Sequence, residues 1–192
     1  MRQDFVSRKT GETDISINMN IDGKGSFNGT SGVGFFDHML NSFAVHGKMD
    51  IDLKAEGDLH VDCHHTVEDI GIVLGQVFNK SLGDKKGITR FGDSLIPMDE
   101  ALAQAVIDIS GRPFLVFNAE FNKPIVGDFD TDMVVEFFRA FAMNAGITLH
   151  INLIYGQNAH HCIEAIFKAV AHSIRKAVEI SSSEILSTKG SL

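Results

Sequence analysis

The chain has 192 residues, 44% hydrophobic and 22% charged, a composition typical of a globular protein with one sizeable core and unlike that of a disordered chain. A formal net charge of −8 argues against a nucleic-acid partner, and no stretch approaches the roughly 18 apolar residues of a membrane span. Residues 1–14 lack a secretory signal, and two cysteines are too few for a disulfide framework, so we expect a cytoplasmic protein.

The first half of the chain alternates between strand and helix patterns. Residues 15–21 (ISINMNI) alternate apolar and polar side chains, as a half-buried strand does, and residues 49–55 do the same. Residues 35–45 have apolar side chains at helical spacing, and Gly47 is placed to end that helix. Residues 66–82 have apolar side chains every three or four positions, which predicts a helix with a wide buried face.

The second half repeats this order. Residues 102–109, 114–121 and 147–154 are predicted strands, and residues 134–143 and 162–178 are predicted helices. Each half runs from strands to a helix with a Phe-Phe pair, then to a strand, then to a helix opened by His-His-x-x-Glu, which indicates an internal duplication. We expect one domain over residues 1–192, with halves of about 1–90 and 91–192. The expected fold is α+β, with two open mixed sheets and the helices packed between them.

The His-His-x-x-Glu motif occurs twice, beginning at His64 and at His160. The composition predicts only about 0.02 such motifs by chance. On a helix, His64 and Glu68 stand one turn apart on one face, whereas His65 points about 100° away. The simplest arrangement therefore uses two ions, with His64 and Glu68 on one and His65 on another, and His160, Glu164 and His161 divide in the same way.

Imidazole and carboxylate ligands together favour manganese, iron, zinc or nickel over calcium or magnesium. His38 and His150 are candidates to complete the two coordination shells. With them, the set contains six histidines and two glutamates, enough for three nitrogens and one oxygen per ion. An octahedral ion would keep positions open for substrate and water, which is a catalytic arrangement rather than a closed structural one.

Each residue also has a structural interpretation. A histidine pair at a helix start can serve only as a solvated cap, but two copies in matching places make that explanation weak. His38 and His150 could be core histidines with satisfied hydrogen bonds. We interpret His46, His60 and His172 as structural or surface positions, and Cys63 and Cys162 as small packing residues.

Several motifs in series resemble those of the imidazoleglycerol-phosphate dehydratase family. They are F-F-D-H-M-L at 35–40, D-C-H-H-T-V-E-D at 62–69, P-M-D-E-A-L at 97–102, S-G-R-P at 110–113, T-L-H at 148–150, G-x-N-x-H-H-x-x-E at 156–164 and S-T-K-G at 187–190. The resemblance runs from about Arg8 to Leu192. It implies halves similar to the second domain of a small-subunit ribosomal protein.

The resemblance further implies an enzyme of histidine biosynthesis that dehydrates imidazole glycerol phosphate to imidazole acetol phosphate. It implies two Mn²⁺ ions that hold the substrate ring as imidazolate, and a homo-oligomer of 24 subunits with active sites where subunits meet. By residue match, the metal ligands are His38, His64, His65, Glu68, His150, His160, His161 and Glu164.

Glu12 matches the general base of the family, although the residues alone indicate only an exposed glutamate. The matched phosphate contacts are Arg90, Arg112, Lys168 and Lys189, with Ser187 beside them. Without the resemblance, each basic residue would be expected as solvated surface, and Arg112 as a turn residue. The chain departs from the common pattern at Asn41-Ser42, often Asp-Gln, and at Cys63, usually Asp, which puts a hydrogen bond to a metal-binding histidine in question.

Two other functional classes use similar residues. A dinuclear metallohydrolase would bind its ions through comparable ligands, but typically with Asp-rich sets and a bridging carboxylate. A metal storage or structural assembly protein would need the two motifs, but neither Glu12 nor convergent Arg and Lys side chains. Turnover of imidazole glycerol phosphate compared with other phosphate esters separates these possibilities.

Overall fold

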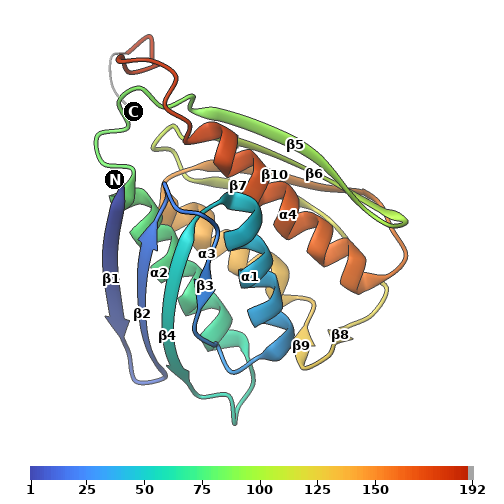
Figure 1. The fold of residues 1–192 in the computed structure, drawn as a ribbon. Helices are drawn as coiled ribbons and strands as arrows, with labels where there is room; N and C mark the ends of the chain where they lie inside the picture. The colour runs from blue at the N-terminus through green and yellow to red at the C-terminus, as the bar shows by residue number, and fades with distance from the viewer. Residues whose placement is uncertain (190–192) are drawn as a thin grey trace.

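The computed structural model describes residues 1–189 of the chain (Figure 1). Residues 190–192 lie outside the described residues, and with them the last residue of the S-T-K-G motif and the end of the predicted domain. The first half contains β1 (Gln3–Lys9), β2 (Thr13–Asn20), β3 (Phe27–Asn28), α1 (Gly34–Gly47), β4 (Asp50–Gly57) and α2 (His64–Ser81). The second half contains β5 (Phe91–Met98), β6 (Ala101–Asp108), β7 (Phe114–Asn118), β8 (Ile125–Val126), β9 (Phe129–Asp130), α3 (Met133–Ala145), β10 (Thr148–Tyr155) and α4 (Ala159–Ala177).

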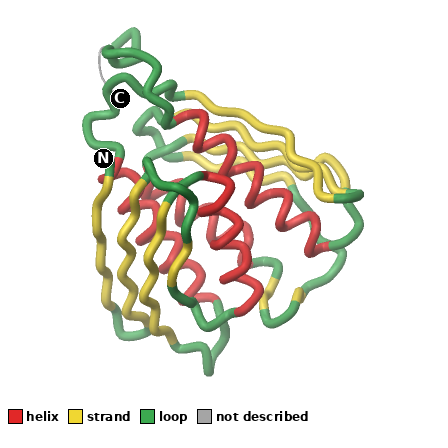
Figure 2. The backbone as a smooth tube through the Cα atoms, viewed as in Figure 1, coloured by secondary structure: helices red, strands yellow, loops and turns green. Residues whose placement is uncertain are grey.

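Two four-stranded sheets enclose the helices. The strand orders are β1-β2-β4-β3 and β5-β6-β10-β7, and in each sheet the last pair is parallel while the others are antiparallel. Figure 2 shows the two sheets as separate layers with the four helices between them. The predicted α+β fold of two similar halves, with open mixed sheets around the helices, is confirmed.

The helix layer is held together by aromatic packing across the two halves. Phe36 of α1 packs edge-on against Phe137 of α3, with ring centroids 5.2 Å apart, and both side chains are fully buried. Helices α2 and α3 approach each other closely because α2 has Gly71 and Gly75 at their contact. A Cβ atom on Gly75 would lie 2.5 Å from the carbonyl oxygen of Phe141. Replacing a buried phenylalanine such as Phe137 with alanine typically lowers the free energy of unfolding by about 3–5 kcal/mol.

The sequence pattern predicted every helix and five of the ten strands in residues 1–189. The predicted helices at 35–45, 66–82, 134–143 and 162–178 correspond to α1, α2, α3 and α4, with ends that differ by up to three residues. The predicted strand at 114–121 is shorter than expected, because β7 ends at Asn118. Strands β1 and β5, and the two-residue strands β3, β8 and β9, were not predicted. Within residues 1–189, no helix is both long and apolar enough to cross a membrane.

His46 of α1 and His172 of α4 pair between their helices. The Nδ1 atom of His46 lies 3.2 Å from the Nε2 atom of His172, and both side chains are partly buried. This contact fits the structural role expected for the two histidines. Burial lowers the pKa of His46, and the charge of Lys168 and the neighbouring His172 lower it further, while Glu164 opposes them. Burial, followed by the charges of Arg175 and Lys176, likewise lowers the pKa of His172.

The His46–His172 pair predicts a loss of stability in mild acid. Both folded-state pKa values lie below the ordinary 6.5, so as pH falls through this value the unfolded chain takes up protons that the folded chain does not. The contribution of this pair to the free energy of unfolding of the metal-free chain should therefore decrease between about pH 7.5 and pH 5.5. In denaturant titrations, the free energy of unfolding of His172→Asn, relative to that of the parent, should rise over this range as the pH falls, while the exposed His60→Asn control keeps the pH dependence of the parent. Equal slopes for both variants would contradict the assignment.

Candidate metal centre

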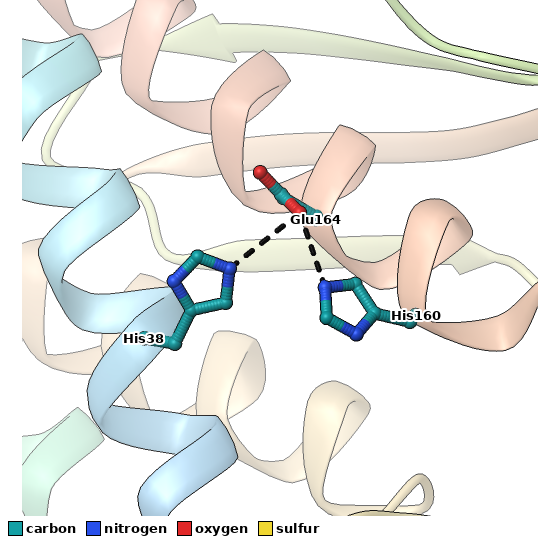
Figure 3. Close-up of side chains that lie close together, drawn as sticks. All are labelled: His38, His160 and Glu164. Atoms are coloured by element: carbon teal, nitrogen blue, oxygen red, sulfur yellow. Dashed lines mark ion pairs between the residues drawn. The ribbon is translucent and has the colours of Figure 1, made fainter.

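Three side chains from two helices converge near the start of α4. Asn158 caps this helix by accepting a hydrogen bond from the backbone N–H of His160 at 3.0 Å. His160 and Glu164 then lie one turn apart, with 3.3 Å between Nε2 and Oε2. His38 of α1 approaches the same carboxylate oxygen to 3.6 Å. Figure 3 shows the three side chains pointing toward one another, and their ligand atoms all lie within 4.8 Å of each other.

Glu164 is charged although it is buried. Its residue is only 7% exposed, and its other carboxylate oxygen accepts a hydrogen bond from the Lys168 ammonium at 2.7 Å. Burial alone would raise the pKa of Glu164, but Lys168, together with His38 and His160, outweighs that effect and leaves the pKa below its ordinary value. The carboxylate is therefore available as an anionic ligand at neutral pH.

The equivalent group on α2 contains only two of the candidate ligands. Asp62 accepts a hydrogen bond from the N–H of His64 at 2.8 Å, as Asn158 does for His160. His64 and Glu68 lie one helical turn apart, with 3.7 Å between Nε2 and Oε2, and both side chains are partly exposed. α3, the counterpart of α1 in the second half, has Ala140 at the position of His38 after its Phe-Phe pair. The α2 group therefore receives no third histidine from α3, the helix that packs against it.

The second histidine of each motif points toward a different carboxylate. The Nδ1 atom of His65 lies 2.9 Å from Asp58, and the Nδ1 atom of His161 lies 2.8 Å from Glu100. These hydrogen bonds raise the pKa of both histidines. They also lower the pKa of Asp58, and that of Glu100 to about 2. A carboxylate on Nδ1 leaves Nε2 to face a metal ion, which is the usual arrangement around metal-binding histidines.

Glu12 lies in the turn between β1 and β2, beside His65. Its Oε2 atom is 3.8 Å from Nδ1 of His65, and the side chain is 56% exposed. Within residues 1–189 its carboxylate accepts no hydrogen bond. The same turn lines a hollow of about 310 Å³ together with Asp58 and His60.

His150 lies apart from all of these groups. It is an exposed residue of β10, between the buried Leu149 and Ile151, so it points away from the helix layer. Its neighbours across the strands are Val106 and Val116. The chain thus assembles His38, His160 and Glu164, brings His64 to Glu68 and His65 to Glu12, and leaves His150 on the outer face of the second sheet.

The candidate phosphate contacts form two groups. Arg90 donates hydrogen bonds to Asp108 at 2.7 Å and to the carbonyl oxygen of Leu186 at 2.7 Å, which holds the C-terminal segment beside β6. Arg112 reaches the same aspartate at 3.9 Å. Ser187 follows Leu186 directly and accepts a hydrogen bond from the N–H of Lys189 at 3.2 Å. Lys168 lies apart from these residues and forms an ion pair with Glu164.

Sequence reasoning did not identify Asp58 and Glu100 as partners of the motif histidines. Glu100 is 61 residues from His161, and only the fold brings the β5–β6 turn to the start of α4. In the motif where Cys63 replaces the usual Asp, the carboxylate partner of His65 is Asp58. Cys63 is half-buried, and Cys162 is buried, as expected for packing residues.

Comparisons with known proteins give one consistent result. The sequence model of the family described as imidazoleglycerol-phosphate dehydratase matches residues 31–174. The chain is 56% identical to the imidazoleglycerol-phosphate dehydratase of Methylorubrum extorquens over 100% of both chains, and 57% identical to that of Acetivibrio thermocellus over 97% of both.

Two solved structures agree with the sequence comparisons. The Staphylococcus aureus protein superposes with a TM-score of 0.82 at 45% identity, covering 93% of this chain and 100% of that one. The Pyrococcus furiosus protein, solved with the compound (S)-C348, superposes with a TM-score of 0.84 at 36% identity. The match covers 97% of this chain and 100% of that one. The chain described here therefore belongs to the imidazoleglycerol-phosphate dehydratase family of hydro-lyases.

Proposed function

We propose that this chain dehydrates imidazole glycerol phosphate to imidazole acetol phosphate, a step of histidine biosynthesis in the cytoplasm. The observation that carries the proposal is the convergence of His38, His160 and Glu164 from two helices. The family membership supplies the substrate and the reaction class. A metal-ligand group of this kind is what a dehydratase needs when the proton to be removed is barely acidic.

The three converging residues fit a divalent ion. Two ligand atoms at right angles around one ion, each about 2.1 Å from it, lie roughly 3 Å apart. The distances of 3.3 Å and 3.6 Å from Glu164 to the two histidines need only a small inward adjustment. Two nitrogens and one anionic oxygen suit Mn²⁺, and we propose two Mn²⁺ ions per active site. When bound, these ions would act as Lewis acids that favour the imidazolate form of the substrate ring.

Within residues 1–189, one chain on its own completes neither coordination shell. His64 and Glu68 provide two ligands, while His65, His161 and His150 point toward other places in the fold. A histidine on the outer face of a sheet can join a metal shell only if another molecule packs there. We therefore propose a homo-oligomer, with 24 subunits as the family resemblance implies, whose active sites lie between subunits and include His150 of a neighbouring copy.

Glu12 is proposed as the general acid and base. The dehydration removes the hydroxyl next to the imidazole ring and the hydrogen on the following carbon, and the resulting enol becomes the ketone. The Glu12 carboxylate is exposed, accepts no hydrogen bond within residues 1–189 and lies beside the ligand candidate His65, so it is free to accept and return that proton. Glu100, by contrast, already binds His161 and two backbone N–H groups.

The phosphate of the substrate is proposed to bind the basic side chains matched from the family. Arg90, Arg112, Ser187 and Lys189 gather near the end of the chain, and Lys168 stands on α4. A bidentate guanidinium suits phosphate oxygens well. Because Lys168 also contacts Glu164, it could connect the phosphate end of the site to the metal end.

A substrate panel tests this proposal. The manganese-loaded protein should convert imidazole glycerol phosphate to the ketone and leave simple phosphate esters intact. Hydrolysis of esters without dehydration would instead favour a dinuclear hydrolase. No turnover of any compound by a fully metal-loaded assembly would favour a storage or structural role.

A further inference from the structure

The turn that contains Glu12 is tied to α2 through three polar residues, which we call the turn clamp: Arg8, Thr13 and Asp69. Asp69 follows Glu68 directly and is only 7% exposed. It accepts a short hydrogen bond from the Thr13 hydroxyl and forms an ion pair with Arg8 at 2.5 Å. The clamp joins β1, the start of β2 and the helix that contains His65.

The clamp reaches Glu12 through one further residue. The hydroxyl oxygen of Thr10 lies 3.2 Å from that of Thr13, and it accepts hydrogen bonds from the N–H groups of Glu12 at 3.1 Å and Thr13 at 3.0 Å. A continuous chain of hydrogen bonds therefore runs from Asp69 through Thr13 and Thr10 to the Glu12 backbone. The turn is fixed by its backbone, and the Glu12 carboxylate is left free.

The second half of the chain lacks this clamp at the same positions. Ala101 opens β6 as Thr13 opens β2, and Ala165 follows Glu164 as Asp69 follows Glu68. Arg8 pairs with the third residue of β2, and in the same register Ile96 pairs with the third residue of β6. Ala101 and Ala165 are fully buried, and Ile96 packs against the core. The fold can therefore be built with apolar side chains at all three positions.

The second half fixes its turn glutamate in the opposite way. Glu100, at the position equivalent to Glu12, is held by its own carboxylate, which accepts hydrogen bonds from the N–H groups of Gln157 and Asn158 and contacts His161. A carboxylate used in this way is not free to move a proton. The Arg8–Asp69 ion pair is partly buried, and such a pair is a weak source of stability compared with apolar packing, so stability alone does not explain the clamp.

From this comparison we infer that the turn clamp positions Glu12 for proton transfer, with Thr13 and Asp69 as positioning residues. The inference rests on the proposed role of Glu12. It divides the duplicated turns between two tasks. In the first half the clamp fixes the backbone and keeps the carboxylate free to react, and in the second half the carboxylate orients a metal-ligand candidate.

A matched pair of substitutions at Thr13 tests the inference. Thr13→Val keeps the shape of the side chain but loses the hydroxyl, and Thr13→Ser keeps the hydroxyl. We expect Thr13→Val to lower kcat by about 10²-fold, because a displacement of about 1 Å at a reacting group has an effect of that size. KM should change by less than about threefold, since substrate binding is not involved. Metal content and sedimentation should match the parent protein, and Thr13→Ser should restore kcat.

Three kinetic results would overturn the inference: equal loss of kcat in both variants, loss of bound metal together with kcat in Thr13→Val, or a parent kcat in Thr13→Val. Amide hydrogen exchange at Glu12 provides a readout that does not depend on activity, and the clamp predicts faster exchange in Thr13→Val. If the parent protein shows no dehydration, the proposed function fails, and exchange alone then decides whether the clamp holds the turn. Unchanged exchange would reject it.

Discussion

Replacing Glu12 with Gln should abolish dehydration while leaving the metal site and the assembly intact. The amide has the shape of the carboxylate but cannot accept a proton, and loss of a general acid or base typically lowers the rate by about 10²–10⁴-fold. The fold should tolerate the change because the side chain is 56% exposed and its carboxylate accepts no hydrogen bond within residues 1–189. Steady-state kinetics should therefore show a fall in kcat, and metal analysis should show no change.

The matched control for this substitution is Glu56→Gln. Glu56 is exposed, lies on β4 and lines the same hollow as Glu12. Glu56→Gln therefore removes one negative charge from this hollow, as Glu12→Gln does. It should keep the parent kcat. If Glu12→Gln loses metal together with activity, Glu12 is a metal ligand and its assignment as acid and base is wrong.

Removing the metal should weaken the assembly. The ligand candidates of one chain point in different directions, with His38, His160 and Glu164 together and His150 on the outer face of the second sheet. An ion shared between subunits would join these side chains, and chelation would remove that link. Sedimentation should show smaller particles after chelation and recovery of the large particle after Mn²⁺ is added.

Substitution at His150 separates this effect from general unfolding. His150→Asn should weaken the metal-loaded assembly, whereas His60→Asn, which changes an exposed histidine outside both motifs, should leave it unchanged. A large particle that persists after complete chelation would show that apolar contacts alone hold the subunits together. The exposed apolar residues of the second sheet, such as Leu95 and Val106, are the ones that would do so.

The helices and the duplication could be predicted because their buried faces are strongly periodic. Strand β5 could not be predicted, because small or polar residues occupy its buried positions and large apolar residues occupy exposed ones. Its inward positions include Gly92 and Ser94, where α4 packs directly on the strand, and a Cβ on Gly92 would lie 2.0 Å from the carbonyl oxygen of Ser173. Its outward positions include the exposed Phe91 and Leu95. Strand β1 was missed because its inward face contains Arg8 of the turn clamp.

Some contacts of the candidate site could likewise be predicted from the local sequence, and others could not because they depend on the fold. The pairing of His64 with Glu68 and of His160 with Glu164 follows from helical geometry, and so does the separation of His65 from His64. The partners of the second histidines depend on contacts across the fold, such as that of His161 with a residue 61 positions away. Glu12 came only from the family resemblance, since a lone exposed glutamate in a turn has no distinguishing pattern.

The most direct test is the dehydration of imidazole glycerol phosphate by metal-stripped protein, measured before and after Mn²⁺ is added. We expect no turnover without metal, because the ligand set of His38, His160 and Glu164 then has no ion to hold the substrate ring. Addition of Mn²⁺ should restore production of imidazole acetol phosphate. No turnover with any divalent ion, despite tight binding of two ions per subunit, would contradict the proposed activity and leave only a metal site.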